Sequence, residues 1–285
     1  MKHIDFKNLD KPYLIGEIGI NHNGDMQIAK KLIDATFACG WDCVKFQKRT
    51  PDLCVPEAQK NILRDTPWGK ISYIDYRKKI EFEKKEFNYI DSYCREKPIN
   101  WSASVWDIPS LEFILDYEVP FLKIPSAHLT NNELIIESAK SGLTILLSTG
   151  MSSIEEIDGA VETLKKYAKN YVLMHTNSSY PTPIDELNLR VIETLKKRYE
   201  CPIGYSGHEY GLEPTLFAVA FGAVVIERHI TIDHEMWGTD QSASVEVMGM
   251  DMLAKRLRNA NKIWGTAEKI ITQSEMPIRQ KLRGN

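Results

Sequence analysis

Short apolar runs alternate along the chain with longer stretches in which apolar residues recur every three or four positions. The short runs have the length of buried strands, and the longer stretches have the period of amphipathic helices. Residues 26–40, 154–169 and 214–223 show the helical pattern, and Asp25 and either Ser152 or Ser153 stand where the first two of these helices would be capped. The predicted strands are residues 13–19, 43–47, 100–105, 121–126, 144–150, 171–176, 202–207 and 224–230.

The number of strand–helix units favours a closed barrel over an open sheet. Alternation alone also fits a doubly wound sheet. Eight units can be counted, however, and the residues around the end of the first strand (17–24, EIGINHNG) lack the G-x-G-x-x-G turn of dinucleotide-binding sheets. The sequence therefore predicts an α/β fold, a single-domain (β/α)8 TIM barrel over residues 1–285.

Two segments interrupt this rhythm. Residues 48–79 connect the second strand to the next helix and are rich in proline, charge and aromatic residues. Connections of this length are commonly lids or binding loops, so we expect a lid here. The charged tail, about residues 265–285, is expected to lie along the surface.

Composition excludes several classes of partner and sets the expected compartment. Basic and acidic residues nearly balance, at 36 against 39, so neither nucleic acid nor a membrane is expected to bind. No apolar stretch reaches the length of a membrane span, and the first residues do not resemble a signal peptide. An odd number of cysteines without a C-x-x-C pair indicates reduced thiols and a cytoplasmic protein; they are Cys39, Cys43, Cys54, Cys94 and Cys201.

Polar and ionisable residues gather at the ends of the predicted strands. In a barrel these carboxyl ends converge on one mouth, where active sites of this fold lie. Because side chains alternate across a strand, Lys45 and Gln47 should share the inner face, and Glu227 and His229 likewise. Arg228 should then face the outer helices and form a structural salt bridge. The strand-end groups are Glu17, Lys45, Gln47, Ser104, Lys123, Ser126, Ser148, Ser206, His208, Glu227 and His229.

Two of these residues suggest a metal site. His208 and His229 end neighbouring strands, and Asp240 follows eleven residues after the second histidine. Two imidazoles with open coordination positions suit an ion that also holds substrate oxygens, such as Mn²⁺, Co²⁺ or Mg²⁺, better than a closed zinc site. We therefore expect a divalent metal, with Mn²⁺ as the first choice.

The lysines and hydroxyls at the mouth suit a small phosphorylated carboxylate. A serine nucleophile is disfavoured because the chain has no G-x-S-x-G elbow. Two alternatives remain. Lys45 or Lys123 could form a Schiff base, as in pyruvate aldolases, or the barrel could bind a sugar phosphate without catalysing any reaction.

Six segments resemble the sialic acid (N-acetylneuraminate) synthase family and occur in that family's order. Together they span roughly residues 13 to 246, most of the chain. The segments are residues 15–47, 122–129 (LKIPSAHL), 147–157 (LSTGMSSIEEI), 175–192 (HTNSSYPTPIDELNLRVI), 203–211 (IGYSGHEYG) and 226–244 (IERHITIDHEMWGTDQSAS).

The resemblance implies a metal-dependent transferase that joins phosphoenolpyruvate (PEP) to an aldose, giving a 3-deoxy-2-keto sugar acid and phosphate. Glu17 would be the acid–base carboxylate, Glu227 would activate water, and His208 and His229 would hold the metal. The implied PEP-binding residues are Lys45, Ser104, Lys123, Ser126, Ser148, Ser178 and Ser206, and the implied sugar-binding residues are Gln47, Tyr180 and Asp240.

The chain also departs from that family's usual pattern. Many members carry a C-terminal antifreeze-like (SAF) domain that reaches into a partner's active site, and we expect a short form without it. The resemblance further implies a homodimer, although part of that interface uses the SAF domain. Residues 237–241 (WGTDQ) differ from the segment of many relatives. Aromatic residues of the expected lid, Trp68, Tyr73 and Tyr76, either replace the missing sugar contacts or simply pack the lid.

Overall fold

Eight parallel strands close into a barrel in the computed structural model, which describes residues 4–284. Closure is direct, because the first strand pairs with the second and also with the last. The predicted (β/α)8 TIM barrel is therefore confirmed, and the open sheet is excluded. The barrel strands are β1 (Tyr13–Gly19), β2 (Cys43–Lys48), β5 (Asn100–Val105), β6 (Phe121–Ile124), β7 (Thr144–Ser148), β8 (Tyr171–Thr176), β9 (Ile203–Gly207) and β10 (Val225–Thr231).

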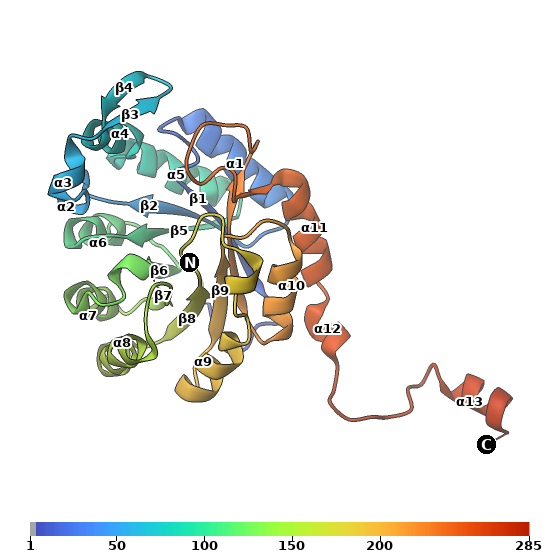
Figure 1. The fold of residues 1–285 in the computed structure, drawn as a ribbon. Coiled ribbons are helices and arrows are strands. Elements are labelled where there is room, and N and C mark those ends of the chain that lie inside the picture. The colour runs from blue at the N-terminus through green and yellow to red at the C-terminus, as the bar shows by residue number, and fades with distance from the viewer. Residues whose placement is uncertain (1–3, 285) are drawn as a thin grey trace.

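Helices lie between successive barrel strands and surround the barrel (Figure 1). The predicted caps are present: the Asp25 carboxylate accepts a hydrogen bond from the Gln27 amide, and Ser153 forms a capping box with Glu156. The outer helices are α1 (Met26–Ala38), α5 (Lys84–Glu96), α6 (Ile108–Leu115), α7 (Asn132–Lys140), α8 (Ile154–Tyr167), α9 (Val191–Tyr199), α10 (Glu213–Ala220) and α11 (Val247–Leu257), with short 3-10 turns at Ser126–His128 and Ile184–Glu186.

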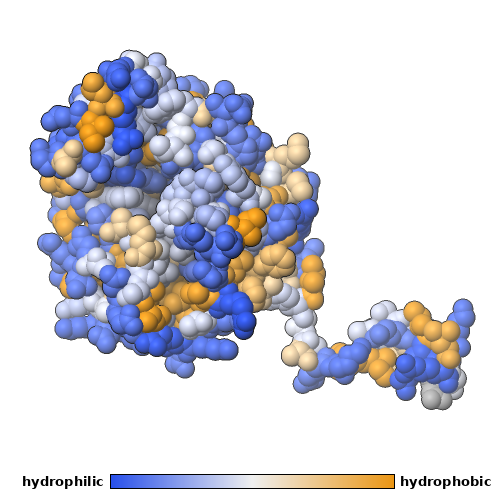
Figure 2. Space-filling view, viewed as in Figure 1, coloured by the Kyte–Doolittle hydropathy of each residue, from blue (hydrophilic) through white to orange (hydrophobic). Residues whose placement is uncertain are grey.

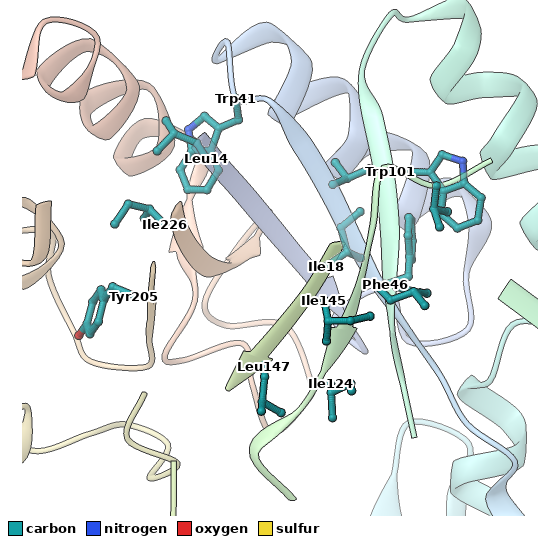
Figure 3. Close-up of a cluster of buried hydrophobic side chains, with 14 of the residues drawn as sticks. Leu14, Ile18, Trp41, Phe46, Trp101, Ile124, Ile145, Leu147, Tyr205 and Ile226 are labelled. Carbon is teal, nitrogen blue, oxygen red and sulfur yellow. The ribbon is translucent and has the colours of Figure 1, made fainter. Parts of the chain in front are cut away.

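Side chains on alternate strand positions build two separate layers of core. Outward residues such as Leu14, Phe46 and Ile226 pack against the helices (Figure 3). Inward residues at the amino ends of the strands form a second apolar cluster that fills the barrel floor, including Ile15, Phe121, Val172, Met174 and Val225. The inward positions change from apolar to charged towards the carboxyl ends of the strands. The floor thus excludes water from below, and polar chemistry is confined to the mouth.

The connection after β2 contains regular structure that the sequence did not predict. It comprises α2 (Pro51–Cys54), α3 (Glu57–Lys60), a hairpin of β3 (Leu63–Thr66) and β4 (Gly69–Ser72), and α4 (Tyr73–Ile80). Trp237, in the segment after β10, contacts both Trp68 of the hairpin turn and Tyr76 of α4, with ring centroids 6.1 and 5.3 Å apart. The Asn23 amide also donates to the Trp237 carbonyl at 2.7 Å. Trp237 therefore connects the segment after β10 with the connection after β2 and with the loop after β1.

The tail does not lie along the surface, so that expectation was wrong. After β11 (Val245–Glu246) and α11, the chain continues through α12 (Ala260–Trp264) and leaves the barrel as an extended segment ending in α13 (Met276–Arg283) (Figure 1). Figure 2 shows apolar residues mixed with polar ones along this arm, and Ile270, Ile278 and Leu282 are all exposed. No helix within residues 4–284 has both the length and the apolarity needed to cross a bilayer.

Arg228 faces outward from β10, as predicted, and forms a buried salt bridge. Its guanidinium pairs with Glu209 at 2.9 Å, and both side chains are about fully buried, at 1% and 0% exposed. Arg228 also donates to the Glu209 carbonyl, the Gly211 carbonyl and the Thr215 hydroxyl. The Tyr205 hydroxyl donates to the second carboxylate oxygen of Glu209 at 2.7 Å. Neither charge is left without a partner.

Arg228→Met should therefore lower the free energy of unfolding by about 3–5 kcal/mol, because it leaves the Glu209 carboxylate buried and unpaired. The double variant Arg228→Met/Glu209→Gln removes both charges and should be more stable than the single variant. Urea unfolding of the three proteins measures both differences. A single variant as stable as the parent protein would contradict the assignment.

Candidate active site

The carboxyl ends of the barrel strands surround a pocket of about 200 Å³. With the exception of Asp240, every site residue predicted from the sequence lines it. These residues are Glu17, Lys45, Gln47, Ser104, Lys123, Ser126, Ser148, Ser178, Tyr180, Ser206, His208, Glu227 and His229. Strand alternation within a closed barrel thus brings together residues that are more than 200 positions apart in sequence.

Two lysines and two glutamates form a connected charge cluster at the bottom of the pocket. Lys45 Nζ lies 2.6 Å from Glu17 Oε2 and 3.6 Å from Glu227 Oε1, and Lys123 Nζ lies 3.2 Å from the same Glu227 oxygen. All four side chains are at most 5% exposed. The cluster is formally neutral, which is the condition under which four charges can remain ionised away from water.

The two lysines differ in electrostatic environment. Burial favours the neutral amine of Lys45, but Glu17 and Glu227 outweigh it and raise the Lys45 pKa. Burial lowers the pKa of Lys123, and the attraction of Glu227 offsets this only in part because Lys45 repels a second positive charge. Burial alone would raise the pKa of Glu227, whereas Lys123 and Lys45 lower it to about 2. Glu227 is accordingly an anion at neutral pH.

Hydroxyl groups line the pocket beside this cluster. Lys45 donates to Ser104 Oγ at 2.7 Å, and Ser206 donates to Glu227 Oε1 at 3.2 Å. Among residues 4–284, the buried Ser148 hydroxyl, Glu227 Oε2 and His229 Nδ1 have no hydrogen-bond partner. Buried polar atoms are rarely left unsatisfied in proteins. These three atoms therefore indicate that the pocket receives a polar ligand.

His208 and His229 lie on adjacent strands, with ring centroids 5.5 Å apart. His208 Nδ1 faces the Asn177 carbonyl at 2.6 Å, which fixes the proton there and leaves Nε2 as the acceptor. Burial, with a further contribution from His229, lowers the His208 pKa to about 3, so its imidazole is neutral. A neutral imidazole can bind a metal ion through Nε2 when the Tyr180 hydroxyl, 2.8 Å away, moves aside.

The protein supplies only part of a coordination sphere. No group of three or more His, Cys, Asp or Glu side chains arranged to bind a metal occurs in the described part of the chain. The partnerless Nδ1 of His229 and the neutral His208 fit an ion that takes its remaining ligands from water or substrate. The residues thus fit an open metal site rather than a closed structural one.

Asp240 and Tyr180 stand at the rim. The Tyr180 ring stacks on His208 with centroids 4.0 Å apart, and its hydroxyl lies 2.8 Å from His208 Nε2. Asp240 Oδ2 is 3.8 Å from His229 Nδ1, and Asp240 does not line the pocket. Asp240 therefore contacts the site through His229, whereas Tyr180 borders the pocket directly.

Several lining residues were not found from the sequence: Trp106, Pro125, Ala127, Met151 and Thr176. Thr176 was detectable in principle, because it occupies the inward position two residues after Met174 on β8. The other four lie on loops after strands, where periodicity carries no information. Arg49 was also missed, although its guanidinium lies 3.6 Å above the Trp106 ring.

Several known proteins are similar to this chain in sequence or structure. The sequence profile of the NeuB family matches residues 32–269. The chain is 34% identical over 273 residues to N-acetylneuraminate-9-phosphate synthase of Mus musculus, covering 95% of this chain and 76% of that protein. It is 34% identical over 282 residues to N,N'-diacetyllegionaminic acid synthase of Legionella pneumophila, covering 95% of this chain and 78% of that protein. The crystal structure of N-acetylneuraminic acid (sialic acid) synthetase from Leptospira borgpetersenii superposes with a TM-score of 0.87 at 33% identity, covering 100% of this chain and 98% of that one.

Gly150 brings the backbone after β7 close to the pocket hydroxyls, and its amide donates to Ser126 Oγ at 3.0 Å. A Cβ at this position would clash with Ser178 Oγ and would lie 2.8 Å from both Ser126 Oγ and Thr176 Cγ2. Gly150→Ala should therefore lower the free energy of unfolding by about 1–3 kcal/mol through overpacking.

Gly159 provides the matched control. It lies within α8 and has no neighbouring atom within 4 Å of an added Cβ. Gly159→Ala should stabilise the protein by about 0.5–1 kcal/mol, because alanine is the better helix former. Urea unfolding measures the free energy of unfolding of both variants. If both substitutions change this free energy in the same direction, the close approach at Gly150 is contradicted.

Proposed function

Because this chain belongs to the NeuB family, we propose that it is a nonulosonic acid synthase that condenses PEP with an aldose. The observation that carries the proposal is the pocket itself, in which two buried lysines and several hydroxyls lie beside the imidazoles of two histidines. That combination suits a ligand with phosphate and carboxylate groups next to a carbonyl that must be polarised. The products would be a 3-deoxy-2-keto sugar acid and inorganic phosphate.

PEP occupies the side of the pocket formed by the lysines. Lys45 and Lys123 supply charged donors, and Ser104, Ser126, Ser148, Ser178 and Ser206 supply hydroxyls around them. Gly150 allows Ser126 and Ser178 to face the same space without a side chain between them. The PEP oxygens attract the ammonium groups of the lysines. The attraction between these lysines and Glu227 then weakens, and the Glu227 carboxylate becomes a stronger base.

The aldose lies towards Gln47 and Tyr180, with its carbonyl near Glu17 and the histidines. His208 and His229 would hold a divalent ion, Mn²⁺ by preference, which when bound polarises the aldehyde as a Lewis acid. Gln47 donates to Glu17 Oε1 at 3.1 Å and Lys45 contacts Glu17 Oε2, so both oxygens of this carboxylate are oriented.

The chemistry requires one carbon–carbon bond to form and one carbon–oxygen bond to break. C3 of PEP attacks the aldehyde carbon, and the carbonyl oxygen takes up a proton that the Glu17 carboxylate relays from water. Water, oriented by Glu227, adds to C2 and loses both protons, one passed on through Glu227 to Glu17 and one taken by the departing phosphate. The bond between C2 and the bridging oxygen then breaks, phosphate leaves, and the 2-keto acid remains. Lys45 and Lys123 stabilise the negative charge throughout.

Phosphate release from PEP tests this proposal directly. The purified chain with Mn²⁺ should release phosphate only when a suitable aldose is present, across a panel of N-acetylmannosamine, mannose, arabinose and their phosphates. A colorimetric phosphate assay with and without a chelator measures the dependence on metal. Release without any sugar, or none with the whole panel, would contradict the proposal.

A pyruvate aldolase is the second candidate, favoured by the lowered pKa of Lys123. Borohydride would then trap pyruvate on Lys123 or Lys45 as an amine adduct visible by mass spectrometry. The synthase should give no adduct, because its carbon nucleophile is PEP and no lysine imine forms.

His208→Ala and His229→Ala should each weaken Mn²⁺ binding by more than about 100-fold, since losing only an outer partner of a metal ligand already costs 10–100-fold. Turnover should fall with binding while the melting temperature stays near that of the parent protein. His234→Ala is the control, because this imidazole is exposed and lies outside the pocket. Calorimetric titration with Mn²⁺ measures the effect, and unchanged binding in both pocket variants would refute the metal assignment.

A further inference from the structure

Four buried hydrogen-bond donors without acceptors lie together beside the active-site pocket. Within residues 4–284, Arg49 Nε, Arg77 Nη2, Tyr76 Oη and Trp106 Nε1 are inaccessible to water and have no hydrogen-bond partner. Tyr76 and Arg77 come from α4, Arg49 follows β2, and Trp106 follows β5. Such groups normally find partners in folded proteins, and here every unsatisfied atom is a donor or, for Tyr76, a hydroxyl that can donate.

In the chain as the structure describes it, neither guanidinium group has a directly paired carboxylate, although the nearby Glu81 carboxylate attracts Arg49. No carboxylate of the described residues forms an ion pair with Arg49 or Arg77, although Arg77 is only 5% exposed. The Glu81 side chain is bonded directly to Lys48 Nζ and to the Arg49 backbone amide instead. Burial, together with repulsion from Arg77, lowers the Arg49 pKa to about 10. Two buried positive charges side by side are costly unless an anion joins them.

This cluster is joined to the catalytic pocket by direct contacts. The Arg49 guanidinium donates to Gln47 Oε1, while the Gln47 amide donates to Glu17. Trp106, over whose ring Arg49 lies, lines the pocket itself. One glutamine side chain therefore separates the Arg49 guanidinium from the carboxylate beside the reacting carbonyl. Of the four residues, Trp106 alone lines the pocket. A sugar whose aldehyde end lies at Glu17 therefore reaches the arginines by displacing the contact between Gln47 and Arg49.

We propose that Arg49, Arg77, Tyr76 and Trp106 form a subsite for an anionic group at the end of the aldose remote from its carbonyl. The inference rests on the proposed function, since it names the class of sugar that the site accepts. A phosphate monoester matches the cluster best, because its dianion balances two guanidinium charges and its oxygens can accept from all four donors. The aldose is thus an aldose phosphate, and a carboxylate-bearing sugar is the other source of the same chemistry.

The test compares matched substrates in Arg77→Gln. With the parent protein, a hexose 6-phosphate such as N-acetylmannosamine 6-phosphate should be used far better than the neutral sugar or the corresponding uronic acid. Arg77→Gln should raise the KM for the sugar phosphate by about 10- to 100-fold, as expected for a lost charge-assisted hydrogen bond. The KM for PEP should stay unchanged, which separates this subsite from the lysines.

Two further measurements separate a binding role from a structural one. Removing an unpartnered buried charge should leave the melting temperature of the free protein equal or higher, whereas a structural arginine would lower it. Lys78→Gln is the matched control, because this neighbour on the same helix is half exposed and pairs with Asp52 on the surface. It should leave the KM for both substrates unaffected.

Mannitol 1-phosphate is an open-chain phosphate without a carbonyl, so it cannot react. Its binding therefore tests the subsite separately from turnover. Calorimetry should show binding to the parent protein and to Lys78→Gln, and none to Arg77→Gln or with mannitol. If no sugar supports phosphate release but this pattern holds, the subsite stands and the proposed reaction fails. Equal use of neutral and phosphorylated sugars, preference for the uronic acid, or equal losses on neutral and phosphorylated sugars in Arg77→Gln would overturn the phosphate assignment.

Discussion

The neutrality of four buried charges is the constraint on which the site depends. Glu17, Lys45, Lys123 and Glu227 are at most 5% exposed, so each can remain ionised only through the others. Their positions follow from inward alternation on four strands, and closure of the barrel brings their charged groups into contact. The apolar floor beneath them removes water from one side and strengthens every interaction above it. The charged state of these four side chains therefore depends together on closure of the barrel, exclusion of water and charge pairing.

Much of this arrangement follows from the sequence, because the inward set obeys a strict period of two. Cys43, Lys45 and Gln47 point inward on β2 while Val44 and Phe46 pack outward, and knowing one position gives the rest. The same alternation predicted from the sequence that Arg228 points away from the pocket, although it did not identify the partner of Arg228. Its partner Glu209 lies on a loop, where no period applies, and only the folded chain shows the pair.

Residues outside the strands resisted prediction for a physical reason. The β3–β4 hairpin is short and largely exposed, so it has little of the apolar alternation that marks a strand. The tail carries isoleucines and a leucine, but their contacts cannot be read from the local pattern, and the expectation that it lies on the surface failed. Met151 and Trp106 enter the pocket because loops bring them there. Site residues on strands were thus accessible to sequence reasoning, and site residues on loops were not.

The balance of charge also explains why the site needs groups beyond its lysines. Glu17 and Glu227 already neutralise Lys45 and Lys123, so an incoming PEP and sugar phosphate would add negative charge to a neutral pocket. Additional positive charge is present nearby, at Arg49 and Arg77 on one side and in any divalent ion held by His208 and His229 on the other. Each lies beyond the central cluster rather than within it. PEP would then bind at the lysines of the central cluster and the anionic group of the sugar at the periphery, which leaves Glu17 and Glu227 beside the reacting atoms.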